Sequence, residues 1–384
     1  MKRPIYLDYC ATTPCDPEVV KVMMPYFSHH FGNPSSNDHL LGWESKEAVE
    51  VARQQLATLI NCKPKDLIFT SGATESINWV LKGLFHNNGR KGHFITTKIE
   101  HSAVLDTMAY LQEQGAELTF LEVDQNGQIL LDDLESSIQD NTLGFVCMYA
   151  NNEIGTILPI DKIGEITVKY NIDLICDGTQ AVGKIPMDLS SSPIAYMAFS
   201  AHKMYGPKGI GGLYIANSDL KSKLGPFLHG GKQEGSFRSG TMNVPGIVGF
   251  GKAAALCYHY MEVEFEQLSS LRDYFELKLG ELSGVIIQAF NGNRLPNVSN
   301  VSFSGVEGER LILNLSKYMA VSRGSACSSI IHRPSHVLKA IGMSDEDALN
   351  AIRFSLGRFT TKEEVETALK VIRDTVLDLK MNIV

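Results

Sequence analysis

Hydrophobic positions follow two alternating patterns between about residue 45 and residue 215. Stretches such as 45–60 and 73–85 place apolar residues at helical spacing, and short continuous apolar runs separate these stretches. Such runs are typical of strands that are buried on both faces of a sheet. The predicted strands are "DLIFTSG" (66–72), "HFITTKIEH" (93–101), "ELTFLEVD" (117–124), "LGFVCMYA" (143–150), "DLICDGTQ" (173–180), "YMAFSAHK" (196–203) and "GGLYIA" (211–216).

This alternation predicts an α/β fold with a mainly parallel central sheet and helices on both faces. After about Asn243 the pattern changes to a long helical stretch at 246–282, a strand-like run at 297–305 and four further helical segments. Thr361 is the expected N-cap of the last segment. "PIYLDY" at 4–9 is expected to add a strand to this second region.

The change in pattern predicts two domains. We expect a large α/β domain at 15–258. We expect a smaller α+β domain to be formed by 1–14 together with 259–384.

Composition and charge exclude several classes of protein. The 384 residues carry a formal net charge of −8, which disfavours direct binding to nucleic acid. No apolar run approaches the roughly 20 residues of a membrane span, and the start of the chain has no long apolar stretch typical of a secretory signal. We therefore expect a cytoplasmic protein that does not enter a membrane.

The seven cysteines are odd in number and form no C-x-x-C pair. Neither a disulfide framework nor a zinc site fits this spacing, so we expect reduced thiols and no bound metal. Most of these cysteines lie in apolar or strand-like surroundings and are expected to be inert core residues. Cys327 differs, because it lies among glycine, serine and alanine.

Short polar segments follow five of the predicted strands. The carboxyl ends of parallel strands meet at one edge of a sheet, which is where ligands bind in such folds. We therefore expect these segments to converge on one site. They are "SGATES", "EHS", "NNEIG", "DGTQ" and "SAHK".

Three of these segments each allow a structural and a chemical interpretation. "TSGATE" at 70–75 is an ordinary strand-to-helix turn or a helix start that binds a phosphate. Asp177 is a helix cap or a buried partner for a cation, and Lys203 is a solvated surface residue or a reactive amine. An amine, a carboxylate and a phosphate site at one sheet edge are together what pyridoxal 5'-phosphate requires.

The chain resembles the cysteine desulfurases of the class V aminotransferase family, which have the fold type I of pyridoxal-phosphate enzymes. The resemblance covers nearly the whole chain and implies a mainly parallel sheet in a large domain, a smaller α+β domain and pyridoxal 5'-phosphate as cofactor. Its motifs are "YLDYCATTP", "FGNPSS", "FTSGATES", "EHSAVLD", "NNEIG", "DGTQAVGK", "SAHKMYGPKGIG", "LHGGKQEGSFRSGTMN", "RGSACSS" and "IRFSLGRFT".

The resemblance assigns roles to residues that match the family motifs. Lys203 would anchor the cofactor as a Schiff base and act in catalysis, Asp177 would pair with the ring nitrogen, and His101 would stack on the ring and move protons. The alternative for His101 is a capping or core histidine. The other residues implied for the cofactor are Ala73, Thr74, Ser200 and His202 at its phosphate, Asn152 and Gln180 near its ring, and Thr241, which would reach the partner subunit's phosphate in a homodimer.

The resemblance also implies a substrate and a sulfur-carrying residue. Arg353, Asn152 and Asn33 would bind L-cysteine, since the planar guanidinium of Arg353 suits a carboxylate. The alternative for Arg353 is a surface ion pair. Cys327 would take the substrate sulfur as a persulfide, with L-alanine as the second product, although "SRGSACSS" read alone is also compatible with a small-residue turn and an incidental cysteine.

The sulfur acceptor stays open at this point. Relatives of this kind serve iron–sulfur scaffolds, tRNA-thiolation proteins and DNA-phosphorothioation proteins. A selenocysteine lyase or an aminotransferase on the same fold is the alternative activity, and a non-catalytic sulfur-carrier scaffold is a further one. The chain departs from the common family loop at Arg323 and Ser328, and the β-branched Ile330 and Ile331 predict an ordered loop over 328–332.

Overall fold

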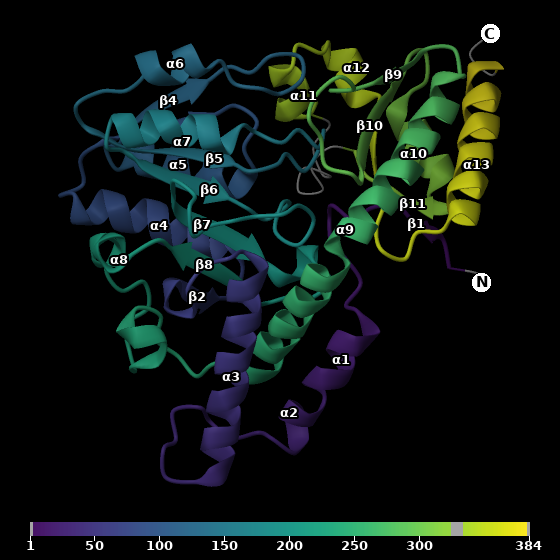
Figure 1. The fold of residues 1–384 in the computed structure, drawn as a ribbon. Coiled ribbons are helices and arrows are strands. Elements are labelled where there is room, and N and C mark those ends of the chain that lie inside the picture. The colour runs from purple at the N-terminus through teal and green to yellow at the C-terminus, as the bar shows by residue number, and fades with distance from the viewer. Residues whose placement is uncertain (1–2, 324–332, 382–384) are drawn as a thin grey trace.

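The computed structural model describes residues 3–323 and 333–381. Within these residues the large central sheet has the strand order β2-β8-β7-β6-β5-β3-β4 (Figure 1). β8 runs antiparallel to β2 and β7, and the other neighbours are parallel. The strands are β2 (Leu67–Thr70), β3 (His93–Thr97), β4 (Glu117–Leu121), β5 (Thr142–Met148), β6 (Asp173–Asp177), β7 (Ile194–Ser200) and β8 (Gly211–Ile215), and they confirm the predicted α/β fold.

Successive residues of the strands enter different hydrophobic cores. Ile68 packs with α4 (Ala73–Asn87) and α5 (Ser102–Glu113), whereas the next residue, Phe69, lies in the core on the opposite face. That second face is covered by α3 (Leu40–Leu59), α7 (Ile160–Lys169) and α9 (Val244–Gly280). Helices therefore cover both faces, as the continuous apolar strand runs predict.

The second region contains two small sheets. β10 (Val298–Phe303) pairs antiparallel with β9 (Val285–Ile287) and with β12 (Ala351–Ser355). β1 (Ile5–Tyr6) pairs with β11 (Met319–Ala320), which confirms that the N-terminal residues add a strand to this region.

Four helices follow β10 in the described part of the chain, in agreement with the sequence pattern. Thr361 caps the last of them, because its Oγ1 accepts the amide of Glu364 and the Glu364 carboxylate accepts the amide of Thr361. The helices are α10 (Gly308–Leu315), α11 (His336–Ala340), α12 (Asp345–Leu349) and α13 (Lys362–Met381).

The long helix α9 joins the two regions. Its first part, as far as Cys257, packs in a core beside the large sheet, whereas its residues from Leu268 onward pack with α13 and β10 (Figure 1). We propose that the chain divides into 15–258 and into 1–14 with 259–384. This boundary would fall inside one continuous helix.

No helix of the described residues has the length and apolar character needed to cross a membrane.

The remaining short elements connect the parts described above. The connecting elements are α1 (Pro17–Met23), α2 (Pro25–Ser28), α6 (Leu131–Ser136), α8 (Ser218–Leu224), η1 (Pro64–Asp66), η2 (Ala201–Lys203) and η3 (Gln233–Ser236).

Candidate active site

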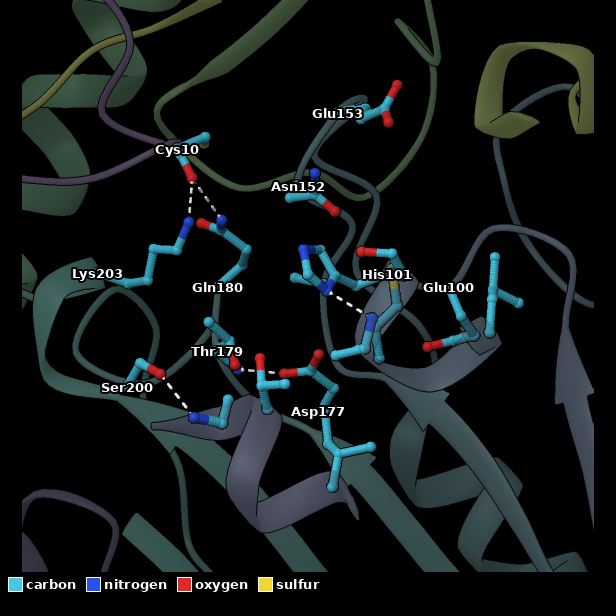
Figure 2. Close-up of a pocket in the computed structure, with 18 of the residues that line it drawn as sticks. Cys10, Glu100, His101, Asn152, Glu153, Asp177, Thr179, Gln180, Ser200 and Lys203 are labelled. Carbon is cyan, nitrogen blue, oxygen red and sulfur yellow. Dashed lines mark hydrogen bonds between the residues drawn. The ribbon is translucent and has the colours of Figure 1, made fainter. Parts of the chain in front are cut away.

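A cavity of about 560 Å³ lies beyond the carboxyl ends of the parallel strands (Figure 2). Its volume is in the range of pockets that hold small ligands. The polar segments that the sequence predicts to converge do meet here. The predicted residues that line the cavity are Ala73, Thr74, His101, Asn152, Asp177, Gln180, Ser200, His202, Lys203 and Arg353.

Lys203 extends from η2 toward the N-terminal segment (Figure 2). Its Nζ donates hydrogen bonds to the carbonyl oxygens of Cys10, at 2.6 Å, and Ala11, at 2.8 Å. Burial lowers the pKa of Lys203 to about 8, and nearby positive groups add to this shift. The amine is therefore partly neutral near pH 8, which a solvated surface lysine is not.

The first turn of α4 forms one wall of the cavity. Gly72 precedes it with a positive φ of 159°, and the amide of Ala73 donates to Ser200 Oγ at 2.8 Å. The amides of a first helical turn have no partner within the helix, so they are available to an anion. Burial lowers the pKa of His202 to about 4, and the charge of Lys203 adds to the shift, so His202 is neutral at pH 7.

Asp177 ends β6 and is 7% exposed. Its Oδ1 accepts the amide of Thr179 at 3.0 Å, so the carboxylate caps the following turn. The same carboxylate lines the cavity. Asp177 can therefore cap the turn and also face a cation in the cavity.

His101 is the N-cap of α5, because its Nδ1 accepts the amide of Ala103 at 3.0 Å. A nitrogen that accepts a hydrogen bond carries no proton, so the neutral ring holds its proton on Nε2. Figure 2 shows that the second ring nitrogen points away from α5 and into the cavity. His101 thus caps α5 through one ring nitrogen and turns the other, proton-bearing nitrogen toward the cavity.

Arg353 on β12 is 1% exposed and reaches the cavity from the second region. Its Nη2 donates to Asp8 and to Ser322 Oγ, both at 2.8 Å, and its Nη1 donates to the carbonyl of Asn152 at 2.9 Å. Arg353 Nε is buried without a hydrogen-bond partner in the described residues. The arginine is therefore a buried wall residue and not a surface ion pair.

Three predicted site residues do not line this cavity. Thr241 is exposed and lines a different hollow beside β2, and Asn33 is exposed in the loop before α3. Cys327 lies outside the described residues, as does the predicted ordered loop at 328–332. The roles of these residues stay predictions. Thr241 would act at a second subunit, and Asn33 would contact a bound substrate.

Both described flanks of the segment that contains Cys327 are attached to the cavity wall. Before it, Ser322 pairs with Arg353 through backbone hydrogen bonds at 2.8 and 3.3 Å. After it, Ser335 donates to the carboxylate of Glu153 at 2.6 Å, and His336 Nε2 lies 2.9 Å from the carbonyl of Glu100. Arg353, Glu153 and Glu100 all line the cavity.

Several residues that line the cavity have no role predicted from the sequence. Neither Glu100 nor Glu153 has an obvious chemical role in the sequence, although Glu100 directly precedes His101 in the motif "EHSAVLD". Most of the cysteines were expected to be inert core residues, and Cys10 is buried, but its carbonyl contacts Lys203 and it lines the cavity. Glu100, Glu153 and Thr179 lie in polar segments that the sequence predicts to meet at this edge, although it gives them no role, whereas only the fold brings Cys10, Ala11 and His336 to the site. The residues without a predicted role are Cys10, Ala11, Glu100, Glu153, Thr179 and His336.

The wall of this cavity is suited to a polar, charged cofactor. Three of its buried polar atoms have no hydrogen-bond partner in the described residues, namely Glu100 Oε2, Thr179 Oγ1 and Arg353 Nε. Such atoms are costly unless a ligand or water pairs with them. Together with a lysine of lowered pKa, a buried carboxylate and a helix N-terminus, they define a pyridoxal-phosphate enzyme of fold type I.

Residues 5–368 match the aminotransferase class-V family, and the chain belongs to this family. Among its relatives are cysteine desulfurases named IscS. The protein of Neisseria meningitidis (serogroup C / serotype 2a, strain FAM18) is 46% identical over 381 residues, which cover 99% of this chain and 94% of the relative. The protein of Salmonella schwarzengrund is 46% identical over 379 residues, which cover 98% of this chain and 93% of the relative.

Solved structures agree with this placement. A NifS-like protein superposes with a TM-score of 0.91 at 38% identity and covers 98% of this chain and 100% of its own. SspA in complex with cysteine has a TM-score of 0.82 at 34% identity, and the superposition covers 93% of this chain and 100% of SspA. DndA from Streptomyces lividans has a TM-score of 0.76 at 32% identity, and the superposition covers 90% of this chain and 97% of DndA.

Proposed function

We propose that this protein is a cysteine desulfurase, which converts L-cysteine to L-alanine and leaves the sulfur as a persulfide on Cys327. The observation that carries the proposal is the cavity in which Lys203, Asp177 and His101 meet Arg353, with both flanks of the Cys327 segment attached to its wall. The cysteine desulfurases among its relatives favour this activity over an aminotransferase or a selenocysteine lyase.

Pyridoxal 5'-phosphate, when bound, supplies an electron sink for the bond that breaks at the substrate Cα. Lys203 would hold it covalently, and Asp177 would keep a proton on the ring nitrogen. The first-turn amides of α4 and the hydroxyl of Ser200 would bind the phosphate, since Ser200 Oγ accepts from Ala73 and its own proton is free to be donated. His202, which is neutral at pH 7, would add a contact to the phosphate without adding charge.

Two residues of the site are placed to take part in proton transfer. Lys203 has a pKa of about 8, so its free amine can take a proton from the substrate Cα and return it. His101 holds a proton on Nε2, which faces the cavity, while Nδ1 is tied to the backbone of α5. The helix cap thus keeps the proton-bearing atom directed at the reacting groups.

Arg353 is the proposed partner of the substrate carboxylate. Its guanidinium is already held by Asp8 and Ser322, so it loses little side-chain freedom when a substrate binds. Within the described residues Nε has no hydrogen-bond partner, and a carboxylate oxygen would satisfy it. Asn152 and Asn33 are proposed to contact the same substrate.

The sulfur step balances without an external oxidant. The thiolate of Cys327 attacks the sulfur of L-cysteine, forming an S–S bond as the substrate carbon–sulfur bond breaks. The electron pair of that bond goes to the substrate β-carbon, which takes up a proton to become the methyl group of L-alanine. The persulfide then passes its outer sulfur to the thiol of an acceptor.

Two substitutions test this function. We expect the purified protein to absorb at roughly 400 nm because of the lysine-bound cofactor, and K203A to lose this band together with all alanine formation. C327S is expected to keep the band and to lose persulfide formation with L-cysteine as substrate. A colourless wild-type protein, or undiminished sulfur transfer by C327S, would contradict the proposal.

The partners and compartment are part of the same proposal. We propose a homodimer in the cytoplasm, in which Thr241 reaches the partner's phosphate site. The six described cysteines are all free thiols, which is compatible with a reducing compartment. The acceptor is an iron–sulfur scaffold, a tRNA-thiolation protein or a DNA-phosphorothioation protein, and trapping of ³⁵S transfer from Cys327 to each candidate distinguishes them.

A further inference from the structure

The side-chain amide of Gln180 has only one orientation that satisfies its neighbours. Lys184 Nζ donates to Gln180 Oε1 at 2.5 Å, and Gln180 Nε2 donates to the carbonyl of Cys10 at 3.0 Å. An ammonium can only donate hydrogen bonds and a carbonyl oxygen can only accept them. If the Gln180 amide were flipped, its NH₂ group would face the Lys184 ammonium and its oxygen would face the Cys10 carbonyl, so neither hydrogen bond could form. The same Cys10 carbonyl accepts Lys203 Nζ, which places the N–H side of Gln180 next to Lys203.

The local chain geometry holds Lys184 in this position. Gly183 has φ +79°, and a side chain there would meet Cys257 Sγ and Met204 Cβ, each at 3.1 Å. A glycine is therefore required where the chain turns against α9. The turn is closed by the amide of Lys184, which donates to the carbonyl of Ala181 at 3.0 Å.

Lys184 has no ion pair with a carboxylate among the described residues. Burial lowers the pKa of Lys184, and the charge of Arg353 adds to this shift, whereas Cys10 and Cys257 oppose it. A half-buried lysine without an acid partner is destabilising on its own. Its only hydrogen-bond partner through Nζ in the described structure is the Gln180 amide, so its placement serves the site rather than the stability of the fold.

We propose that Lys184 is a positioning residue that makes Gln180 present its N–H, and not its oxygen, to the cofactor ring. The inference rests on the proposed function, in which Gln180 lies near the phenolate oxygen of pyridoxal 5'-phosphate. A donated N–H stabilises that oxygen in its anionic form, whereas a carbonyl oxygen in its place would repel it.

The test is the pH midpoint of the cofactor absorption band in the resting holoenzyme, measured without substrate. Loss of the donated hydrogen bond destabilises the deprotonated chromophore, so the midpoint rises. We expect K184M and Q180A each to raise it by about 0.5–1 pH unit, and K184R to leave it unchanged because arginine keeps the donor. The double variant K184M/Q180A is expected to match Q180A alone, since both substitutions remove the same contact.

A matched control separates this effect from general electrostatics. Lys208 is exposed and near enough to lower the pKa of His202, and no hydrogen bond joins it to Gln180 in the described structure. K208M is therefore expected to leave the midpoint unchanged. An equal shift in K208M, or additive shifts in the double variant, would overturn the proposal.

A second variant keeps Lys184 in place, in case K184M does not fold. Q180E puts an oxygen where Nε2 now lies and gives Lys184 a carboxylate partner, so it is expected to raise the midpoint as well. An unshifted midpoint in both K184M and Q180E would refute the role of Lys184. Absence of any cofactor band in the wild type would instead refute the proposed function itself.

Discussion

Glu100 is a buried acid whose protonation depends on the fold. Its side chain is fully buried, Oε1 accepts the hydroxyl of Thr97 at 2.7 Å and Oε2 has no partner in the described residues. Burial raises the pKa of Glu100 to about 8, and the nearby negative charge of Asp177 adds to the shift. At pH 7 the site therefore has a neutral Glu100 beside the Asp177 carboxylate.

This raised pKa predicts a pH-dependent stability. The pKa of this carboxyl in the unfolded chain is near 4.5. The contribution of Glu100 to the free energy of unfolding is therefore fully present below pH 4.5 and is lost as the pH rises toward 8. We expect E100Q, which cannot ionise, to gain about 2–4 kcal/mol in unfolding free energy over wild type at pH 8. Denaturant unfolding of the holoenzyme at pH 5 and pH 8 measures the difference.

The exposed Glu113 on the neighbouring α5 is the matched control. E113Q is expected to follow the wild-type pH dependence, because that carboxylate is solvated in both states. If E100Q and wild type lost stability in parallel between pH 5 and pH 8, Glu100 would not be the protonated group.

His101 combines a structural and a proposed catalytic role, which two substitutions can separate. Asparagine is a good N-cap, so H101N is expected to unfold within about 0.5 kcal/mol of wild type, whereas H101A loses the cap and about 1 kcal/mol. Both variants lose the proton on Nε2, and we expect alanine formation to fall at least about 100-fold in each. Thermal unfolding and alanine assays on both variants measure these effects. An active H101N would assign His101 to capping alone.

At the scale of elements, the segment that carries the motif "LHGGKQEGSFRSGTMN" is tied to the edge of the large sheet. Arg53 on α3 forms a two-point ion pair with Glu234 in η3, with N–O distances of 2.7 and 3.0 Å. Glu234 also accepts the amide of Phe69 on β2 at 3.0 Å. The side chains are 10% and 4% exposed, so the pair is largely excluded from water.

Removal of one partner from this pair leaves the other charge buried. We expect E234A to cost about 3–5 kcal/mol in unfolding free energy. Glu50 provides the control, because it also contacts Arg53, at 3.4 Å, but is 58% exposed. E50A is expected to cost less than about 1 kcal/mol. Equal losses in the two variants would show that burial does not decide the strength of these pairs.

At the scale of the molecule, the segment from α2 to the start of α3 exposes large apolar side chains. It lies at the end of the molecule opposite α11 and α12 (Figure 1). Exposed apolar surface of this extent is typical of protein interfaces. The side chains and their exposed fractions are Met24 (57%), Phe27 (62%), Phe31 (66%), Leu40 (62%) and Trp43 (53%).

We predict that this surface forms the proposed homodimer interface. F31D is expected to weaken the dimer at least about tenfold, because it places a charge in an apolar contact. L313D serves as the control, since Leu313 is equally exposed, at 66%, on α10. Sedimentation of both variants and wild type provides the measurement. If Thr241 reaches the partner's phosphate, the F31D monomer also binds pyridoxal 5'-phosphate more weakly. A dimeric F31D would place the interface elsewhere.

The sequence by itself determined the strands, the order of the elements and the edge at which the polar segments meet. Continuous apolar runs can only be buried on both faces, and parallel strands bring their carboxyl ends together, so Asp177 and Lys203 were predictable neighbours. The family motifs added pyridoxal 5'-phosphate and Cys327.

The tertiary structure alone decided which groups face the site from distant parts of the chain. Asp8 meets Arg353, Cys10 meets Lys203, and their separations along the chain are too large for any local pattern to indicate a contact. Burial also depends on every packed neighbour at once. The lowered pKa of Lys203 and the raised pKa of Glu100 therefore follow from the folded environment and not from residue type.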